Sequence, residues 1–241
     1  MFLGNGVLAV VPARGGSRGI PRKNLARLRG RSLVGHAALL LGELNWLDAA
    51  ILSTDDEEIA DEGVRQGLWV PALRPTELAT DASESAPMWR HAWLMAEEYL
   101  AETFDVSVLI EPTCPLRRPE DIERCLTAMI QGGHAAGATV SRTPSQFTPH
   151  KTVVMDDCGV LHSFLPAEQS PTRRQEIPEQ YNRNGACYAA RRDTVVERLL
   201  IAQEDCVGVT VDRPLVNIDE PFDLEYAAWL MNRQLGTDHE P

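Results

Sequence analysis

The chain has 241 residues, a hydrophobic content of 44% and a formal net charge of −12. This composition suits one globular domain rather than a disordered chain, and the acidity excludes the broad basic face of a nucleic-acid-binding protein. No apolar run reaches the roughly 18 residues of a membrane span. Five scattered cysteines without a C-x-x-C pair favour free thiols. We therefore expect a cytoplasmic protein without nucleic-acid or membrane partners.

Short apolar runs alternate with amphipathic segments along the chain. We expect strands at 7–13, 49–54, 69–74, 105–111, 136–142, 185–190 and 206–212, and helices at 32–44, 56–67, 83–100, 119–131 and 221–234. This alternation predicts an α/β fold with a mainly parallel sheet between helices. Such sheets bind ligands at the carboxyl ends of their strands.

The alternation lapses between residues 143 and 183. Five prolines fall in this stretch, and a Cys158-Gly159 turn separates two short β-like runs. We expect a hairpin or small lobe that projects from the main sheet, inserted in a single domain that spans residues 1–241.

The segment "VVPARGGSRGIPRKN", residues 10–24, follows the first expected strand. Three glycines, three arginines and one lysine lie between Arg14 and Lys23. Glycines let backbone N–H groups approach a phosphate, and the cations neutralise its charge. The segment fits neither the Walker A pattern nor G-x-G-x-x-G. A solvated basic loop is the alternative, but the convergence of strand, glycines and cations favours a phosphate site.

Five further segments agree in order with a known family: "STDDEEIA" (53–60), "LRPTELATD" (73–81), "EPTCPLR" (111–117), "RRQEIPEQYNRNGACY" (173–188) and "VNIDEPFDLEYA" (216–227). Together with the glycine loop they resemble the acylneuraminate (CMP-sialic acid) cytidylyltransferases. The resemblance implies a Rossmann-like fold of the nucleotide-diphospho-sugar transferase (GT-A-like) type. It also implies that a nonulosonic acid attacks the α-phosphate of CTP, that pyrophosphate leaves, and that Mg²⁺ or Mn²⁺ assists. A homodimer is implied too, with 143–183 as its dimerisation and sugar-binding lobe.

The resemblance also assigns roles to single residues. Arg14, Lys23 and Asp219 would be catalytic, and Asn24 and Arg74 would contact the base and ribose. The nucleotide site as a whole would comprise Ala13, Arg14, Gly15, Gly16, Ser17, Arg18, Lys23, Asn24 and Arg74.

Two positions depart from the family pattern on the metal side. Where the sialic-acid enzymes have two aspartates on one face of a short strand, this chain has Asn217 and Asp219, and Glu111 stands where they have glutamine. An asparagine ligates Mg²⁺ without adding charge. We hypothesise that Asp219 and Glu111 form the Mg²⁺ pair with Asn217 secondary. The alternative is that Glu111 contacts the sugar or is structural.

The substrate carboxylate calls for arginine, which binds it in a planar, bidentate way. Arg174 is the first candidate and Arg183 the second, because Asn182 occupies the place of the family's second arginine. Arg117 is a further sugar-side candidate with a structural alternative. The departures leave open a different ulosonic acid, such as legionaminic, pseudaminic or 3-deoxy-octulosonic acid, or a non-catalytic homologue that binds nucleotide or sugar.

Overall fold

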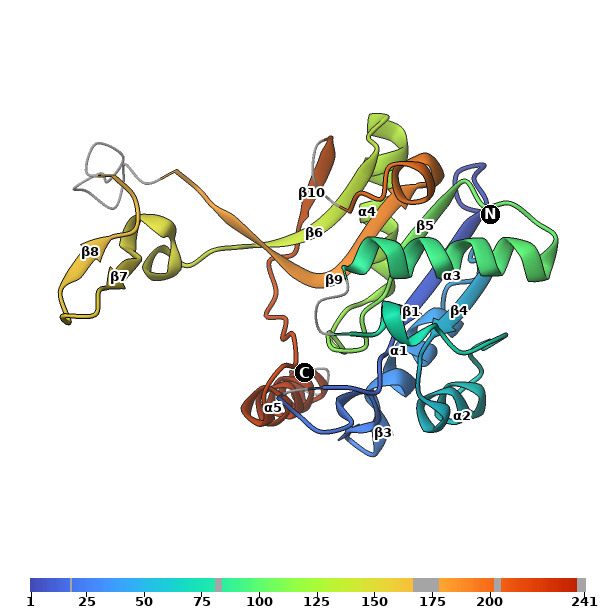
Figure 1. Cartoon of the computed structure of the whole chain (residues 1–241), viewed down its shortest axis with the longest axis horizontal. Coiled ribbons are helices and arrows are strands. Elements are labelled where there is room, and N and C mark those ends of the chain that lie inside the picture. The colour runs from blue at the N-terminus through green and yellow to red at the C-terminus, as the bar shows by residue number, and fades with distance from the viewer. Residues whose placement is uncertain (18, 81–83, 167–177, 202–204, 238–241) are drawn as a thin grey trace.

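The computed structural model describes residues 1–17, 19–80, 84–166, 178–201 and 205–237. Its centre is a six-stranded sheet in the order β10-β6-β9-β5-β1-β4 (Figure 1). The strands are β1 (Val7–Pro12), β4 (Ala49–Ser53), β5 (Val106–Leu109), β6 (Ala136–Arg142), β9 (Tyr181–Arg191) and β10 (Cys206–Thr210). β1 is parallel to β4 and β5, and β10 is parallel to β6, while β9 runs antiparallel between β5 and β6. The predicted mainly parallel α/β sheet is confirmed.

Helices cover both faces of this sheet. Alternate residues of β1 point to opposite sides. Val7, Ala9 and Val11 pack with α1 (Leu33–Gly42), α2 (Glu57–Arg65) and α4 (Pro119–Gly132). Leu8 and Val10 pack with α3 (Ser85–Leu100) and the helical turn Asp193–Glu197. Trp89 and Trp93 of α3 are fully buried there. The short strands β2 (Arg27–Leu28) and β3 (Arg31–Ser32) form a separate ribbon before α1.

The strand expected at 69–74 is wrong. Trp69 makes one bridge with Ile51, and its carbonyl accepts the Leu52 amide at 2.9 Å. Pro71 has no amide hydrogen to extend a ladder. The chain instead turns back so that the Arg74 amide donates to the Thr54 carbonyl at 2.7 Å. This turn delivers Arg74 to the carboxyl end of β4.

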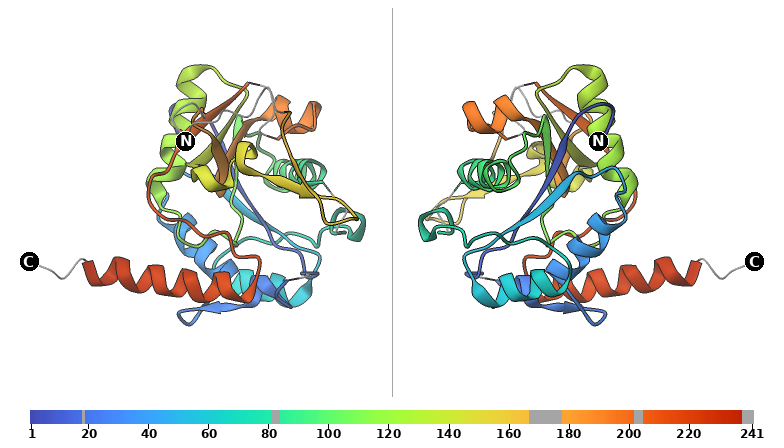
Figure 2. Two further views of the ribbon diagram at one scale, coloured as in Figure 1. Left: turned by 90° about the vertical axis from the view of Figure 1, so that its left-hand side faces the viewer. Right: turned by 90° about the vertical axis from the view of Figure 1, so that its right-hand side faces the viewer.

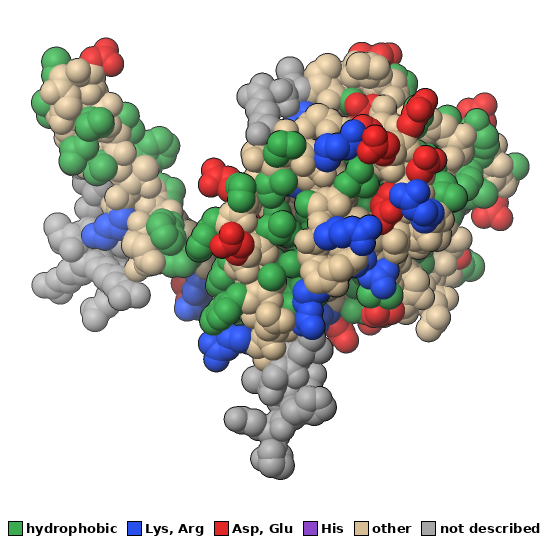
Figure 3. Space-filling view, turned by 90° about the horizontal axis from the view of Figure 1, so that it is seen from below, with side chains coloured by type: hydrophobic (Ala, Val, Ile, Leu, Met, Phe, Trp, Pro, Cys, Tyr) green, Lys and Arg blue, Asp and Glu red, His purple; other side chains and the backbone are tan. Residues whose placement is uncertain are grey.

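The segment after β6 leaves the sheet and forms a projecting lobe (Figure 1). It contains the antiparallel strands β7 (Val153–Met155) and β8 (Leu161–Ser163), and Gly159 supplies the left-handed turn with φ of +80°. Tyr181 already belongs to β9, so the predicted boundary at residue 183 falls inside that strand. Apolar side chains gather on the lobe surface (Figure 3), and those more than half exposed are Phe147, Val153, Val154, Met155, Val160, Leu161 and Phe164.

The last helix, α5 (Pro221–Thr237), extends outward from the body (Figure 2). Ala227 and Leu230 of α5 pack with Leu28 and Ile218 in a third apolar cluster. This packing holds residues 216–219 beside the sheet. Among the described residues, no helix is long and apolar enough to cross a membrane.

Candidate active site

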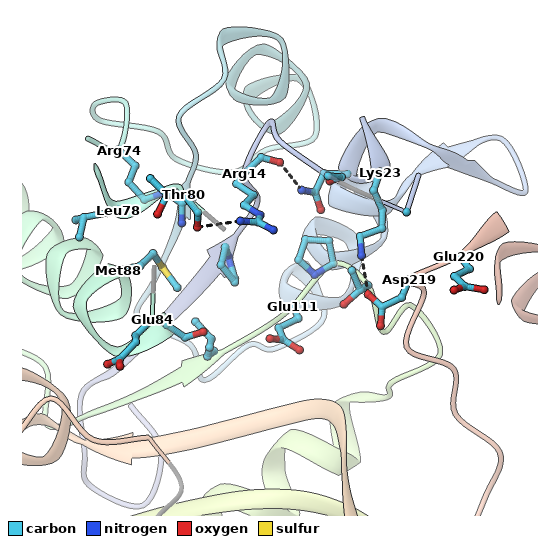
Figure 4. Close-up of a pocket in the computed structure, with 18 residues that line it drawn as sticks. Arg14, Lys23, Arg74, Leu78, Thr80, Glu84, Met88, Glu111, Asp219 and Glu220 are labelled. Atoms are coloured by element: carbon cyan, nitrogen blue, oxygen red, sulfur yellow. Dashed lines mark hydrogen bonds and ion pairs between the residues drawn. The ribbon is translucent and has the colours of Figure 1, made fainter. Parts of the chain in front are cut away.

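A pocket of about 540 Å³ opens at the carboxyl ends of β1 and β5 (Figure 4). Segments far apart in sequence line it: the glycine loop, residues 74–80, the first turn of α3, residues 111–113 and residues 219–220. Its cations are Arg14, Lys23 and Arg74, and its carboxylates are Glu84, Glu111, Asp219 and Glu220. The fold therefore brings together most of the described residues that the sequence assigned to nucleotide and metal.

The glycine loop is tied to the end of β4 through its backbone. The Ala13 amide donates to the Ser53 carbonyl at 2.9 Å, and the Gly15 amide donates to Asp55 Oδ1 at 3.0 Å. A Cβ at Gly15 would lie 2.7 Å from Asp56 Oδ2, so a side chain there would displace the loop. Ala13 and Gly15 thus shape the loop, while Arg14 and Ser17 line the pocket. A Cβ at Gly16 would meet open space.

Hydrogen bonds fix the positions of Arg14 and Asn24, at the start and the end of the glycine loop. Arg14 Nη1 donates to the Thr80 carbonyl, and Asn24 Nδ2 donates to the Arg14 carbonyl, both at 2.9 Å. Asn24 is buried, and both residues line the pocket. An amide side chain carries both an acceptor oxygen and donor hydrogens, so Asn24 suits a ligand that both donates and accepts hydrogen bonds.

Lys23 faces the C-terminal segment. Its Nζ atom lies 2.8 Å from Asp219 Oδ1, and the side chains are 16% and 67% exposed. A Cβ at Gly19 would overlap the Asp219 carbonyl oxygen, so the glycine loop and residue 219 are in direct contact. The chain thereby places a cation and a carboxylate, separated by 196 positions, on one side of the pocket.

Arg74 lies across the pocket from Asp219 (Figure 4). Burial lowers the pKa of its guanidinium, and the neighbouring Asp55 carboxylate opposes that shift. Leu78 and Met88 line the same part of the pocket. This end is consequently more apolar than the end that carries Lys23 and Asp219.

Glu111 and Asn217 converge above Gly185. A Cβ at Gly185 would lie 3.3 Å from Glu111 Oε2 and 3.7 Å from Asn217 Oδ1, and its φ of +73° also favours glycine. Burial raises the pKa of the Glu111 carboxyl, and the charge of Asp219 raises it further, whereas Arg117, Lys23 and Arg183 lower it. Glu111, Asn217 and Asp219 therefore form one neighbourhood.

Residues 217–219 are not a strand, contrary to the family pattern. The Ile218 amide makes a hydrogen bond of 2.8 Å to the Thr113 carbonyl, and its side chain is buried in the third cluster. Asn217 and Asp219, on either side of it, are exposed. The expected alternation survives because Ile218 anchors the segment.

The oxygen donors at this end suit a hard divalent cation. Two carboxylates and an amide carbonyl are ligands that Mg²⁺ accepts. Within the described part of the chain, no group of three or more His, Cys, Asp or Glu side chains could hold a metal ion. The donor set is therefore sparse, and phosphate oxygens of a substrate would have to complete it.

The residues predicted to bind the sugar lie in different surroundings. Arg183 is exposed on β9, two residues before Gly185, which approaches Glu111, and its charge lowers the pKa of both Glu111 and Tyr188. The neighbouring Asn182 accepts a hydrogen bond from the Thr143 hydroxyl at 3.3 Å. Arg117 is buried, and its guanidinium donates to the carbonyls of Cys114 and Glu111. Arg117 thus holds the 111–117 loop, whereas Arg18 and Arg174 lie outside the described residues.

Sequence reasoning missed Thr80 and Met88 and assigned no role to Asp55. Thr80 acts through its carbonyl and Met88 through its place on α3, and neither leaves a pattern in the sequence. Asp55 had a signal, since it follows β4, whose partner β1 carries the glycine loop. Its neighbour Asp56 caps α2 by accepting the Ile59 amide at 3.0 Å.

A mainly parallel sheet with a pocket of cations and carboxylates at the carboxyl ends of its strands is typical of nucleotide-binding α/β proteins. The model of the family described as Cytidylyltransferase matches residues 8–205, and the chain belongs to that family of nucleotidyltransferases.

Two curated relatives align over nearly the full length of both chains. The CMP-N,N'-diacetyllegionaminic acid synthase of Legionella pneumophila is 29% identical over 95% of each chain. The post-translational flagellin modification protein B of Campylobacter coli is 27% identical over 95% of this chain and 96% of its own. The structure of CMP:2-keto-3-deoxy-manno-octonic acid synthetase complexed with CTP superposes with a TM-score of 0.69 and 18% identity, over 95% of this chain and 99% of that one. This superposition supports the fold.

Proposed function

We propose that the protein activates a nonulosonic sugar acid with CTP and forms a CMP-sugar and pyrophosphate. The observation that carries the proposal is the convergence of Arg14 and Lys23, from the loop after β1, with Asp219 and Glu111 in one pocket. The names of relatives that act on legionaminic and pseudaminic acids support a nonulosonate as the substrate class.

In this reaction the anomeric 2-hydroxyl oxygen of the sugar acid bonds to the α-phosphorus of CTP, and the bond from that phosphorus to the β-phosphate bridging oxygen breaks. Negative charge collects on the departing pyrophosphate. Arg14 and Lys23 are fixed cations at the loop, and fixed charges stabilise such a transition state without reorganising. The Lys23 ammonium can exchange Asp219 for a phosphate oxygen within the same pocket.

Asp219 and Glu111 would hold Mg²⁺, with Asn217 as a weaker third ligand. Cytidylyltransferases of this kind generally use a divalent metal, and the oxygen donors described above fit one. A bound Mg²⁺ would supply positive charge at the phosphates and orient them for in-line displacement. Manganese satisfies the same oxygen ligands.

The sugar carboxylate would be bound by Arg183, together with Arg174 as the resemblance implies. Arg183 lies on β9 two residues before Gly185, which approaches Glu111, and this supports the first assignment. Legionaminic, pseudaminic and eight-carbon ulosonic acids all carry this carboxylate, so Arg183 does not distinguish them.

The reaction is tested by pyrophosphate release from CTP and Mg²⁺ with sialic, legionaminic, pseudaminic and 3-deoxy-octulosonic acids in turn. We expect release with at least one nine-carbon acid and none with CTP alone. Release with 3-deoxy-octulosonic acid alone would replace the substrate class. Absence of release with all four acids, alongside measurable CTP binding, would favour a non-catalytic binding protein.

We further propose that the protein is a homodimer joined through the 143–183 lobe. A two-stranded hairpin is marginally stable by itself, and β7–β8 carries exposed apolar side chains that a second copy could cover. Sedimentation at micromolar concentration should show a dimer, and Met155→Glu should produce a monomer.

A cytoplasmic location fits the five free cysteines.

A further inference from the structure

Arg74 is more deeply buried than Lys23, and the carboxylate beside it is less exposed than Asp219. Its Nη2 atom lies 3.6 Å from Asp55 Oδ1, with side chains 4% and 21% exposed. This distance is within ion-pair range but longer than a hydrogen bond. In the described structure, the buried Nε and Nη2 atoms of Arg74 have no hydrogen-bond partner. Asp55 therefore balances the charge of Arg74 while leaving N–H donors unused.

Asp55 also fixes the position of the glycine loop. The same Oδ1 atom accepts the Gly15 amide at 3.0 Å. Backbone hydrogen bonds reinforce this arrangement on both sides, from Ala13 to Ser53 and from Arg74 to Thr54. One carboxylate thus sets the spacing between the loop that carries Arg14 and the guanidinium of Arg74.

The charge balance decides what Arg74 can bind well. Net attraction for a triphosphate is weak when a carboxylate is held beside a buried cation, because the two Coulomb terms largely cancel. The Lys23 pair differs, since its partner Asp219 is 67% exposed and can move away from the ammonium. The neighbouring carboxylate does not change the directions of the unused N–H donors of Arg74, which a planar guanidinium presents in a fixed geometry. Neutral acceptors such as the carbonyl of a pyrimidine or the hydroxyls of ribose match such donors. Leu78 and Met88 at this end of the pocket favour the same neutral group.

We propose that Asp55 is a positioning residue that neutralises Arg74 and so commits its guanidinium to the nucleoside end of CTP rather than to the phosphates. The inference rests on the proposed CTP pocket. Arg14 and Lys23 then serve the triphosphate, so the two ends of the pocket bind different parts of the nucleotide.

Asp55→Asn removes the negative charge and keeps the size of the side chain, and the asparagine oxygen can still accept the Gly15 amide. Titration calorimetry without divalent metal would measure the affinities for CMP and for inorganic tripolyphosphate. We expect CMP to bind about tenfold more weakly, since a buried charged pair orients the donor. Tripolyphosphate should bind at least as tightly as to the wild type, because the pocket gains net positive charge.

Asp61→Asn is the matched control, since Asp61 is exposed on α2 and loses the same charge. It should change neither affinity. In an Arg74→Gln background, Asp55→Asn should no longer affect CMP. Equal weakening of both ligands by Asp55→Asn, or an undiminished effect on CMP without Arg74, would overturn the positioning role. A wild-type protein that binds neither CMP nor CTP would instead overturn the proposed function.

Discussion

The two ends of the pocket are built in different ways. At the nucleoside end, Arg74 is buried, and hydrogen bonds between adjacent strand ends set its place relative to the glycine loop. At the metal end, Asp219 is 67% exposed and comes from a segment nearly 200 positions away from Lys23. The first end is preorganised by the sheet, whereas the second depends on side chains whose final positions a ligand and a cation can still adjust. Variants at the metal end should therefore change the metal requirement, and variants at the nucleoside end should change affinity.

The largest effect is expected at Asp219. Asp219→Ala removes an exposed carboxylate from the proposed metal ligands and should abolish Mg²⁺-dependent turnover, measured as pyrophosphate release over a Mg²⁺ titration. Glu225→Ala, which removes an exposed carboxylate of α5, should retain activity. An Asp219→Ala enzyme with the normal Mg²⁺ response would remove this residue from the metal site.

The second-largest effect is expected at Lys23. Lys23→Ala should lower turnover at saturating substrates by at least ~10²-fold if the ammonium stabilises the leaving pyrophosphate. Arg22→Ala is the control, because Arg22 forms surface pairs with Asp56 and Glu58, which contribute little. Unchanged turnover in Lys23→Ala would show that the Lys23 ammonium is not needed to stabilise the leaving pyrophosphate.

Glu111→Gln tests whether the carboxylate of this chain compensates for Asn217. Losing one negative charge should raise the Mg²⁺ concentration for half-maximal turnover by about tenfold. Glutamine preserves size, so folding should be retained, as thermal denaturation would verify. Full activity at the wild-type Mg²⁺ concentration would contradict the pairing of Glu111 with Asp219.

The smallest effect is expected for Asn217→Asp. An added carboxylate beside Glu111 should strengthen cation binding and lower the Mg²⁺ requirement by a few fold. Turnover at saturating Mg²⁺ should remain close to that of the wild type. A higher Mg²⁺ requirement would count against the proposed ligand set.

The sheet and the nucleotide loop could be predicted from sequence because their signals are local. Apolar periodicity marks the strands, and the glycines and cations after β1 mark the loop. The false strand at 69–74 had the right apolar residues, but the turn at Pro71 that sends Arg74 toward Thr54 depends on a tertiary hydrogen bond.

Contacts between distant segments explain the rest. Asn217 and Asp219 are exposed because the Ile218 side chain between them is buried against α5. This arrangement does not require a strand. Arg117 sits in a motif that resembles a sugar-binding segment, but the guanidinium turns inward to backbone carbonyls. Asp55 opens the acidic run at the start of α2, and its contact with Arg74 follows from the neighbouring positions of β1 and β4. Such pairings require three-dimensional information.

The contact between Gly19 and the Asp219 backbone bears on the biosynthesis of the protein. A ribosome makes the glycine loop among the first residues of the chain, but the surface against which Gly19 packs emerges only when more than nine-tenths of the chain has been translated. The strands β1, β4 and β5 can pair earlier, since all of them precede residue 110. The nascent chain can therefore form these strand pairs before its pocket is complete, and a product truncated before residue 216 would carry the cationic loop without the segment that contacts it.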